Sequence, residues 1–231
     1  MDVAHRKSRY AAFLLTIAFM AIFTAFISAE CLQTSVNNDL GYVNLCIMYL
    51  LTAVFTNVAP VVLRRLDESG TSFRGVFIVS TILYGNSVLS NAWPTAFVII
   101  PAAIGVGASG PFLWTAQKEY IGRVALQASR DTGVTLEQTT TMLDAFFNAG
   151  LMTCGAVGNF VNSTVVIFVG ADKLSWLFII LAGLSLLAII PFIMLPAVTC
   201  HRDNTTRSQS ICMGIWRPMK FAVQDPCMRL F

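Results

Sequence analysis

Charged residues are scarce in this 231-residue sequence, where Asp, Glu, Lys and Arg together make up 12%. Soluble globular domains carry roughly a quarter charged residues, so this composition argues against a water-soluble domain. Hydrophobic residues make up 56% of the sequence, and its mean hydropathy is +0.70. Little charge and an excess of apolar residues together predict a membrane protein.

Residue patterns that typically form catalytic or metal sites are also lacking. The two histidines, His5 and His201, lie far apart in the sequence. We find no metal-ligand pair, no nucleophile with a neighbouring base and no phosphate-binding P-loop motif. The sequence therefore predicts neither an enzyme nor a cofactor. The net charge of +3 needs no nucleic acid, because basic loops beside anionic lipid explain it.

The apolar residues form long runs and do not alternate as they would in β-strands. Tyr10 to Ala29 is free of charge, and its twenty residues would rise about 30 Å as a helix, the thickness of a bilayer core. A cleaved signal peptide is the alternative for this run, but the run is longer than a signal peptide's apolar region. Six runs of this kind predict spans at residues 10–29, 42–63, 75–92, 95–117, 141–168 and 174–198.

These runs predict an all-α, polytopic membrane helix bundle of six transmembrane helices over residues 1–198, followed by a tail at 199–231. With the N-terminus inside, fourteen of the fifteen Lys and Arg residues fall in cytosolic segments, and only Lys173 falls outside. Both termini are therefore predicted to be cytosolic, in the plasma membrane or an endomembrane. The six cysteines suggest no disulfide framework. Asn162 begins a glycosylation sequon near the predicted outer face, at the end of the fifth span.

Three glycines, Gly105, Gly107 and Gly110, have the spacing of a dinucleotide-binding loop. Such a loop joins a strand to a helix in a soluble βαβ unit, whereas these glycines lie midway along the fourth predicted span. Gly105 with Ser109, and Gly107 four residues after a small alanine, have the spacing that lets membrane helices approach closely. We therefore interpret these residues as helix-packing positions.

The same stretch carries a family resemblance. Gly105 to Tyr120 reads G-x-G-A-x-x-x-x-x-W-T-A-Q-x-x-Y, which resembles the fourth-span signature of the family named for the nematode "uncoordinated ninety-three" protein, a branch of the major facilitator superfamily. "FTAFISAECLQTSV" from Phe23, "NVAPVVLRRL" from Asn57 and "GNFVNSTVV" from Gly158 resemble its first, second and fifth spans. Lys118 departs from the family, which usually has Gly there. Family members have twelve spans, so the chain resembles the N-terminal half of a major-facilitator-type fold.

The resemblance implies an accessory or regulatory subunit, since relatives are described as regulating a potassium channel or as escorting Toll-like receptors. The fold it implies gives the alternative, a secondary transporter of a small solute or a truncated, non-transporting half of one. Major facilitators place substrate between two halves, so a lone half is expected to need a membrane-protein partner or a second copy of itself. Membrane lipid is the remaining expected partner.

The fifth span contributes two predicted faces. Asp144, Asn148 and Asn159 fall within an arc of about 60° and are candidates for lining a cavity or binding a partner. Asp144 has an alternative role as part of a capping box at the start of the helix. Gly150 and Gly158 form a separate small-residue stripe predicted to pack against another helix.

Four further candidates lie near span ends. Glu30 and Gln33 follow the first span, where simple solvation is the alternative to a binding role. Gln117 and Trp114 are candidates through the family signature. The alternative for Trp114 is an interfacial aromatic belt, and the residues after Gln117 fit a snorkelling Lys118 paired with its neighbour Glu119.

Overall fold

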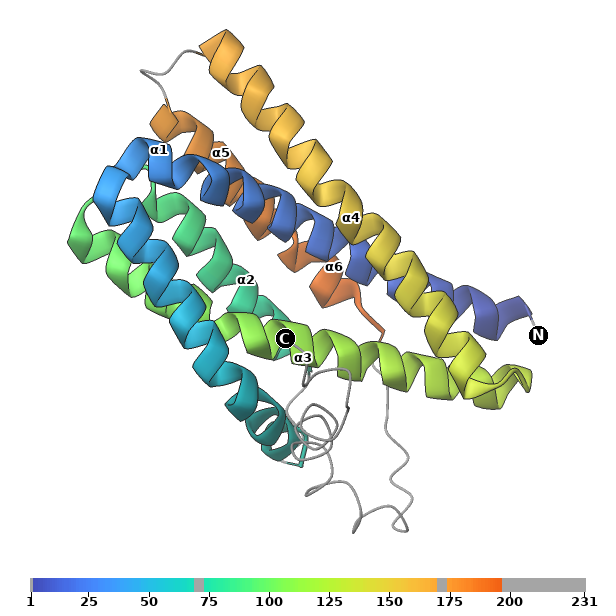
Figure 1. Ribbon diagram of the computed structural model, residues 1–231. Helices are drawn as coiled ribbons and strands as arrows, with labels where there is room; N and C mark the ends of the chain where they lie inside the picture. Colours follow the sequence, from blue (N-terminus) through green and yellow to red (C-terminus); the bar gives the residue numbers. More distant parts are fainter. Residues whose placement is uncertain (1, 69–72, 170–173, 197–231) are drawn as a thin grey trace, which may run out of the picture. The chain divides into compact units, whose positions relative to one another are not determined.

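The structure is a computed structural model that describes residues 2–68, 73–169 and 174–196 (Figure 1). The described ranges are helical and contain no strand, which confirms the all-α prediction. The chain divides into two units, residues 1–198 and 199–231. The predicted cytosolic tail at 199–231 and the predicted outer Lys173 lie outside the described residues.

Six helices follow one another along the described chain. They are α1 (Asp2–Glu68), α2 (Phe73–Ser90), α3 (Ala96–Thr132), α4 (Leu136–Val169), α5 (Leu174–Leu187) and α6 (Ile189–Met194). The helix α3 continues well beyond the predicted span end at residue 117. It ends where Gly133 adopts a left-handed conformation, φ 74°, and donates its N–H to the Ser129 carbonyl, which is a common way to terminate a helix.

The helix α1 contains a sharp bend, and its two arms hold the predicted spans 10–29 and 42–63 (Figure 1). At the bend Asn38 has φ 49° and ψ −130°, outside the helical region. Asparagine tolerates positive φ better than most residues, but glycine fits best. Gly41 follows, and a Cβ there would lie 2.5 Å from the Gln33 carbonyl oxygen. The expected loop between the first two spans is thus a tight helical bend.

Four helices among the described residues are long and apolar enough to cross a bilayer: Arg6–Asp67, Phe73–Ser90, Ala96–Thr132 and Leu174–Met194. The first is 62 residues long, roughly 90 Å if it were straight, so each arm beside the bend exceeds the bilayer core of about 30 Å. The helix α4 is not among these four described stretches. The chain is a helical membrane bundle, and the count of six spans stays a prediction.

The first arm of α1 lies at the centre of the bundle. The ring of Phe19 meets aromatic rings from four other helices in edge-to-face contacts that favour packing beyond simple burial. Its partners are Phe77 of α2 at 6.4 Å, Trp114 of α3 at 5.5 Å, Phe147 of α4 at 5.0 Å and Phe192 of α6 at 6.1 Å between ring centroids. One side chain of α1 therefore joins five helices.

Candidate functional site

The signature residue Gln117 is fully buried in α3, with 0% of its surface exposed. Neither its amide nitrogen nor its amide oxygen has a hydrogen-bond partner among the described residues. A buried polar group left unpaired costs about 1–3 kcal/mol. Within the described residues, the Gln117 amide thus contributes no stabilising hydrogen bond to the bundle.

The neighbouring Trp114 lies inside the bundle. Its ring contacts Phe19, Phe23 at 5.0 Å and Phe147 at 6.5 Å between centroids. An interfacial aromatic belt would instead present the ring to the membrane surface. The partly buried ring packs among α1 and α4 side chains one turn from Gln117.

The charged residues after Gln117 do not pair with each other. Lys118 Nζ lies 3.1 Å from the Asp144 carboxylate of α4, and Glu119 accepts hydrogen bonds from Arg123. The expected pairing of Lys118 with Glu119 is therefore wrong. The capping-box interpretation of Asp144 is also wrong, since α4 begins at Leu136 and Asp144 lies two turns inside the helix.

Arg123 is the centre of a polar contact that our sequence analysis did not single out. Its guanidinium donates to both Asp67 oxygens, at 2.9 and 2.8 Å, and lies 4.5 Å from the centroid of the Phe73 ring. A planar guanidinium suits this two-pronged contact and also stacks on an aromatic ring. Arg123 thus joins α3 to the end of α1 and the start of α2. The four-residue spacing from Glu119 was the available sequence signal.

Two further contacts tie the same end of the bundle to the end of α6. Arg74 donates to the Leu195 carbonyl, and Tyr120 donates to the Pro196 carbonyl at 3.1 Å. We call the set of these contacts the inner-end network, since its residues fall in or beside segments predicted to be cytosolic. Its members are Asp67, Phe73, Arg74, Lys118, Glu119, Tyr120, Arg123, Asp144, Leu195 and Pro196.

The structure places the two predicted faces of α4 differently. A Cβ on Gly150 would lie 2.2 Å from the Thr16 side chain, and one on Gly158 would lie 2.7 Å from Ser28 Oγ, so this stripe faces α1 at close range. Asn148 and Asn159, by contrast, are exposed. Asp144, at the N-terminal end of this face, is half-buried. The two exposed asparagines leave the rest of the face accessible to a partner.

The candidates at the bend of α1 also find partners. Gln33 is 4% exposed and accepts a 2.6 Å hydrogen bond from Asn44, so it is not solvated as the alternative interpretation had it. Glu30 accepts a hydrogen bond from the Tyr49 hydroxyl. These bonds link the two arms of α1, which is a structural role.

The sequon residue Asn162 is buried as well. It is 7% exposed, and its Nδ2, the atom that would carry a glycan, donates to the Ser28 carbonyl at 2.9 Å. A bulky glycan requires an exposed acceptor. The geometry therefore disfavours the expected modification at Asn162 in this conformation.

The glycines of the fourth span lie within α3, so they do not form the strand-to-helix turn of a nucleotide-binding loop. A Cβ on Gly107 would lie 2.6 Å from the Met48 carbonyl oxygen, and one on Gly105 would lie 3.1 Å from a Leu83 methyl group. Ser109 is buried and donates to the carbonyl of Val106 at 3.2 Å. The helix α3 thus approaches the second arm of α1 closely at Gly107.

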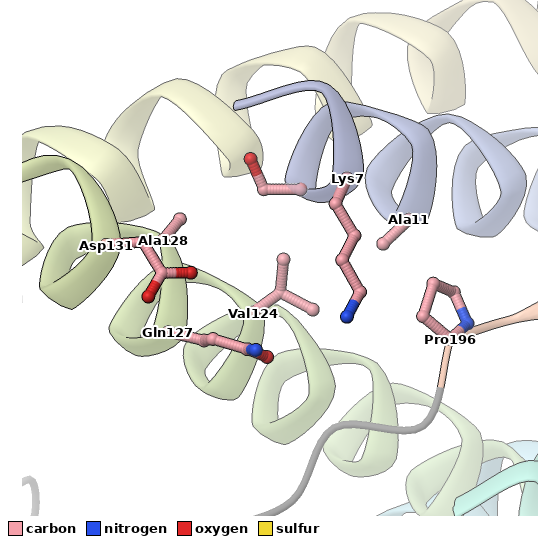
Figure 2. Close-up of a pocket in the computed structure, with 8 residues that line it drawn as sticks. Lys7, Ala11, Val124, Gln127, Ala128, Asp131 and Pro196 are labelled. Atoms are coloured by element: carbon pink, nitrogen blue, oxygen red, sulfur yellow. The ribbon is translucent and has the colours of Figure 1, made fainter. Parts of the chain in front are cut away.

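A small pocket of about 30 Å³ lies near the N-terminal end of α1. In Figure 2, Lys7 of α1 lies across from Gln127 and Asp131 of α3, with Pro196 to one side. This volume holds about one water molecule, so the pocket is too small for an organic ligand. Among the described residues, no group of three or more His, Cys, Asp or Glu side chains is arranged to hold a metal ion.

Comparison with known proteins gives this arrangement a family. The family model described as "Ion channel regulatory protein UNC-93" matches residues 32–229, which cover the signature stretch of α3 and all of the inner-end network.

Individual relatives support the match. The chain is 33% identical over 164 residues to the "Putative potassium channel regulatory protein unc-93" of Caenorhabditis elegans, covering 69% of this chain and 22% of that protein. It is 30% identical to "UNC93-like protein 3" of Arabidopsis thaliana, covering 52% of this chain and 25% of the relative. It is 24% identical to "Protein unc-93 homolog A" of Xenopus laevis, covering 66% of this chain and 33% of the relative. The chain thus spans a third or less of each relative's length, and it belongs to the UNC-93 family of ion channel regulatory proteins.

Proposed function

We propose that this protein is a non-enzymatic, multi-pass accessory subunit that regulates an ion channel by binding it within the membrane. The observation that carries the proposal is the family match across residues 32–229, because that family is described as regulating ion channels. The C. elegans relative is named for a potassium channel, which makes such a channel the first partner to test. We further propose six spans with both termini in the cytosol, on the strength of the basic-residue distribution.

Within this proposal, the exposed asparagine face of α4 meets the partner, and the buried Gln117 transmits the effect of binding to the bundle. Gln117 has an unpaired amide at a position where an apolar residue would be more stable. It precedes Lys118, whose ion pair with Asp144 leads directly to the face that carries Asn148. Buried charges and amides in a membrane bundle typically mark functional positions.

The test replaces Gln117 with Leu in the full chain, co-expressed with a potassium channel. Leu removes two unpaired polar atoms and replaces them with an apolar side chain of similar size. We therefore expect a higher unfolding temperature in detergent. We also expect channel co-purification and the chain's effect on the channel current to fall about tenfold. The separation of these two effects distinguishes a functional amide from a structural one.

Ser185→Ala is the matched control. Ser185 is also 0% exposed and its hydroxyl also has no hydrogen-bond partner among the described residues, but it lies on α5. This variant should keep channel association in full. The proposal fails if the unaltered chain neither co-purifies with the channel nor changes its current. Solute flux in proteoliposomes without channel association would instead favour the transporter.

A further inference from the structure

A groove of about 500 Å³ lies between the first arm of α1 and the beginning of α4. This volume falls within the range of roughly 300–1,000 Å³ that is typical of small-molecule sites. The groove floor is formed by Ala12 and Leu143, which are 3% and 2% exposed. Its other lining residues are Arg9, Tyr10, Phe13, Met142 and Phe146.

The walls of the groove are apolar and open outward. Tyr10 is 45% exposed, Phe13 48%, Met142 37% and Phe146 49%. Exposed apolar side chains of a membrane bundle suit contact with lipid chains. The small Ala12 at the floor makes the surface concave. An acyl chain lying in the groove would therefore contact side chains of both α1 and α4.

Positive charge stands at one end of the groove. Arg9 lines the groove, and Arg6 lies on the same helix face, three residues before it. Phe13 follows four residues after Arg9, so along α1 two cations come first and the aromatic walls follow. The order matches a phospholipid lying along the helix, with its headgroup at the membrane surface and a chain toward the interior.

The acidic side chains of α4 lie away from the groove. Asp144 faces Lys118 of α3, and Met142 and Phe146 are each two residues from it, about 200° around the helix. Glu137, the acidic residue of the first turn of α4, precedes Asp144 by seven residues and so shares its side of the helix. The charge at the groove is therefore positive, which complements an anionic headgroup.

We propose that the groove between α1 and α4 binds an anionic glycerophospholipid of the cytosolic leaflet, such as phosphatidylserine. Arg9 and Arg6 contact the headgroup phosphate and carboxylate, and one acyl chain lies between Phe13 and Phe146. The cytosolic leaflet supplies such lipids and attracts basic segments next to membrane spans. The bound lipid fixes the position of α1 against α4, the two helices that meet at the Gly150 contact.

The test uses the full chain purified in mild detergent and incubated with phosphatidylserine or phosphatidylcholine, with bound lipid counted by native mass spectrometry. We expect preferential retention of phosphatidylserine. Arg9→Gln should weaken that binding about fivefold, the usual effect of removing one cation from an anionic membrane surface, with little change for phosphatidylcholine. Arg6→Gln combined with Arg9→Gln should weaken it further.

Lys7→Gln is the matched charge control, because Lys7 lies on the same turn but lines the other pocket. Met142→Trp should fill the groove and reduce retention of both lipids. Met152→Trp, at a 75% exposed position of α4 outside the groove, should not. Glycerophosphoserine, which lacks acyl chains, should fail to compete at the same concentration.

Several results would overturn the proposal. If Lys7→Gln reduced phosphatidylserine retention as much as Arg9→Gln, the lipid would be attracted only by general surface charge. If glycerophosphoserine competed with the lipid, the groove would be a site for free anions. Equal retention of the two lipids by the unaltered chain would remove the headgroup contact. If the chain formed a dimer without bound lipid, and Met142→Trp dissociated that dimer, a second copy of the chain would be the molecule that occupies the groove.

Discussion

At the scale of single residues, close helix contacts depend on positions where no side chain fits. A Cβ on Gly107 would meet the Met48 carbonyl oxygen at 2.6 Å and the Leu51 Cβ at 3.0 Å, whereas nothing lies within 4 Å of a Cβ on Gly122 in the same helix. Backbone atoms cannot move aside as a flexible side-chain end can. Gly107 and Gly122 lie in the same helix and differ in the atoms that an added Cβ would meet, so Gly122 serves as the control for Gly107.

Gly107→Ala should destabilise the bundle by about 1–3 kcal/mol, because overpacking forces α3 away from α1. Gly122→Ala should be neutral or stabilising by up to about 1 kcal/mol, because alanine favours the helix over glycine and meets no neighbour. Unfolding of both variants in mild detergent measures the difference. Equal stability of the two variants would contradict the close approach at Gly107.

At the scale of helices, the inner-end network fastens elements that are far apart in the sequence. The two-pronged contact of Arg123 with Asp67 and its stacking on Phe73 hold α3, α1 and α2 together. The Arg123 side chain is 12% exposed and that of Asp67 is 38% exposed, so solvent screens the pair only in part. The pair of Lys118 with Asp144 is more exposed, at 58% and 29%.

A double-mutant cycle with Arg123→Lys and Asp67→Asn should give a coupling energy of about 1 kcal/mol, because lysine cannot form the two-pronged contact. The equivalent cycle with Lys118→Gln and Asp144→Asn should give about 0–0.5 kcal/mol, as is usual for an exposed pair. Unfolding in detergent measures both cycles. A larger coupling energy for Lys118 and Asp144 would show that burial does not determine which of the two ion pairs is stronger.

At the scale of the whole molecule, the distribution of basic residues predicts the orientation in the membrane. Fourteen of the fifteen Lys and Arg residues fall on one side of the six predicted spans, and cytosolic segments retain such residues. The bend of α1 agrees with this arrangement, since it returns the second arm toward the end from which the first arm began (Figure 1).

Protease added to sealed, right-side-out vesicles should therefore spare epitope tags placed at the N-terminus and at the C-terminus of the chain. Both tags should be lost once detergent opens the vesicles, which serves as the control for accessibility. Loss of both tags from intact vesicles would reverse the orientation. Loss of one tag alone would contradict an even number of spans.

How much of the candidate site could be predicted from the sequence depends on the kind of signal each residue carries. Gln117 and Trp114 were identified through a local motif, and the motif also led to the correct family. Arg123 and Asp67 were not paired, because they are 56 residues apart and belong to different helices. Asp144 was misread for a related reason, since its role depends on where α4 begins and on Lys118 of α3.

The sequence by itself determined that this protein is helical and that it belongs in a membrane, because composition and long apolar runs act locally and independently of the rest of the chain. Its local motifs determined which family it joins. Only the tertiary structure decided which polar groups are paired. The bend at Asn38, the burial of Gln33 and Asn162 and the unpaired amide of Gln117 all depend on which helices meet. Residue type fixes what a side chain can bond to, but only packing brings its partner within reach.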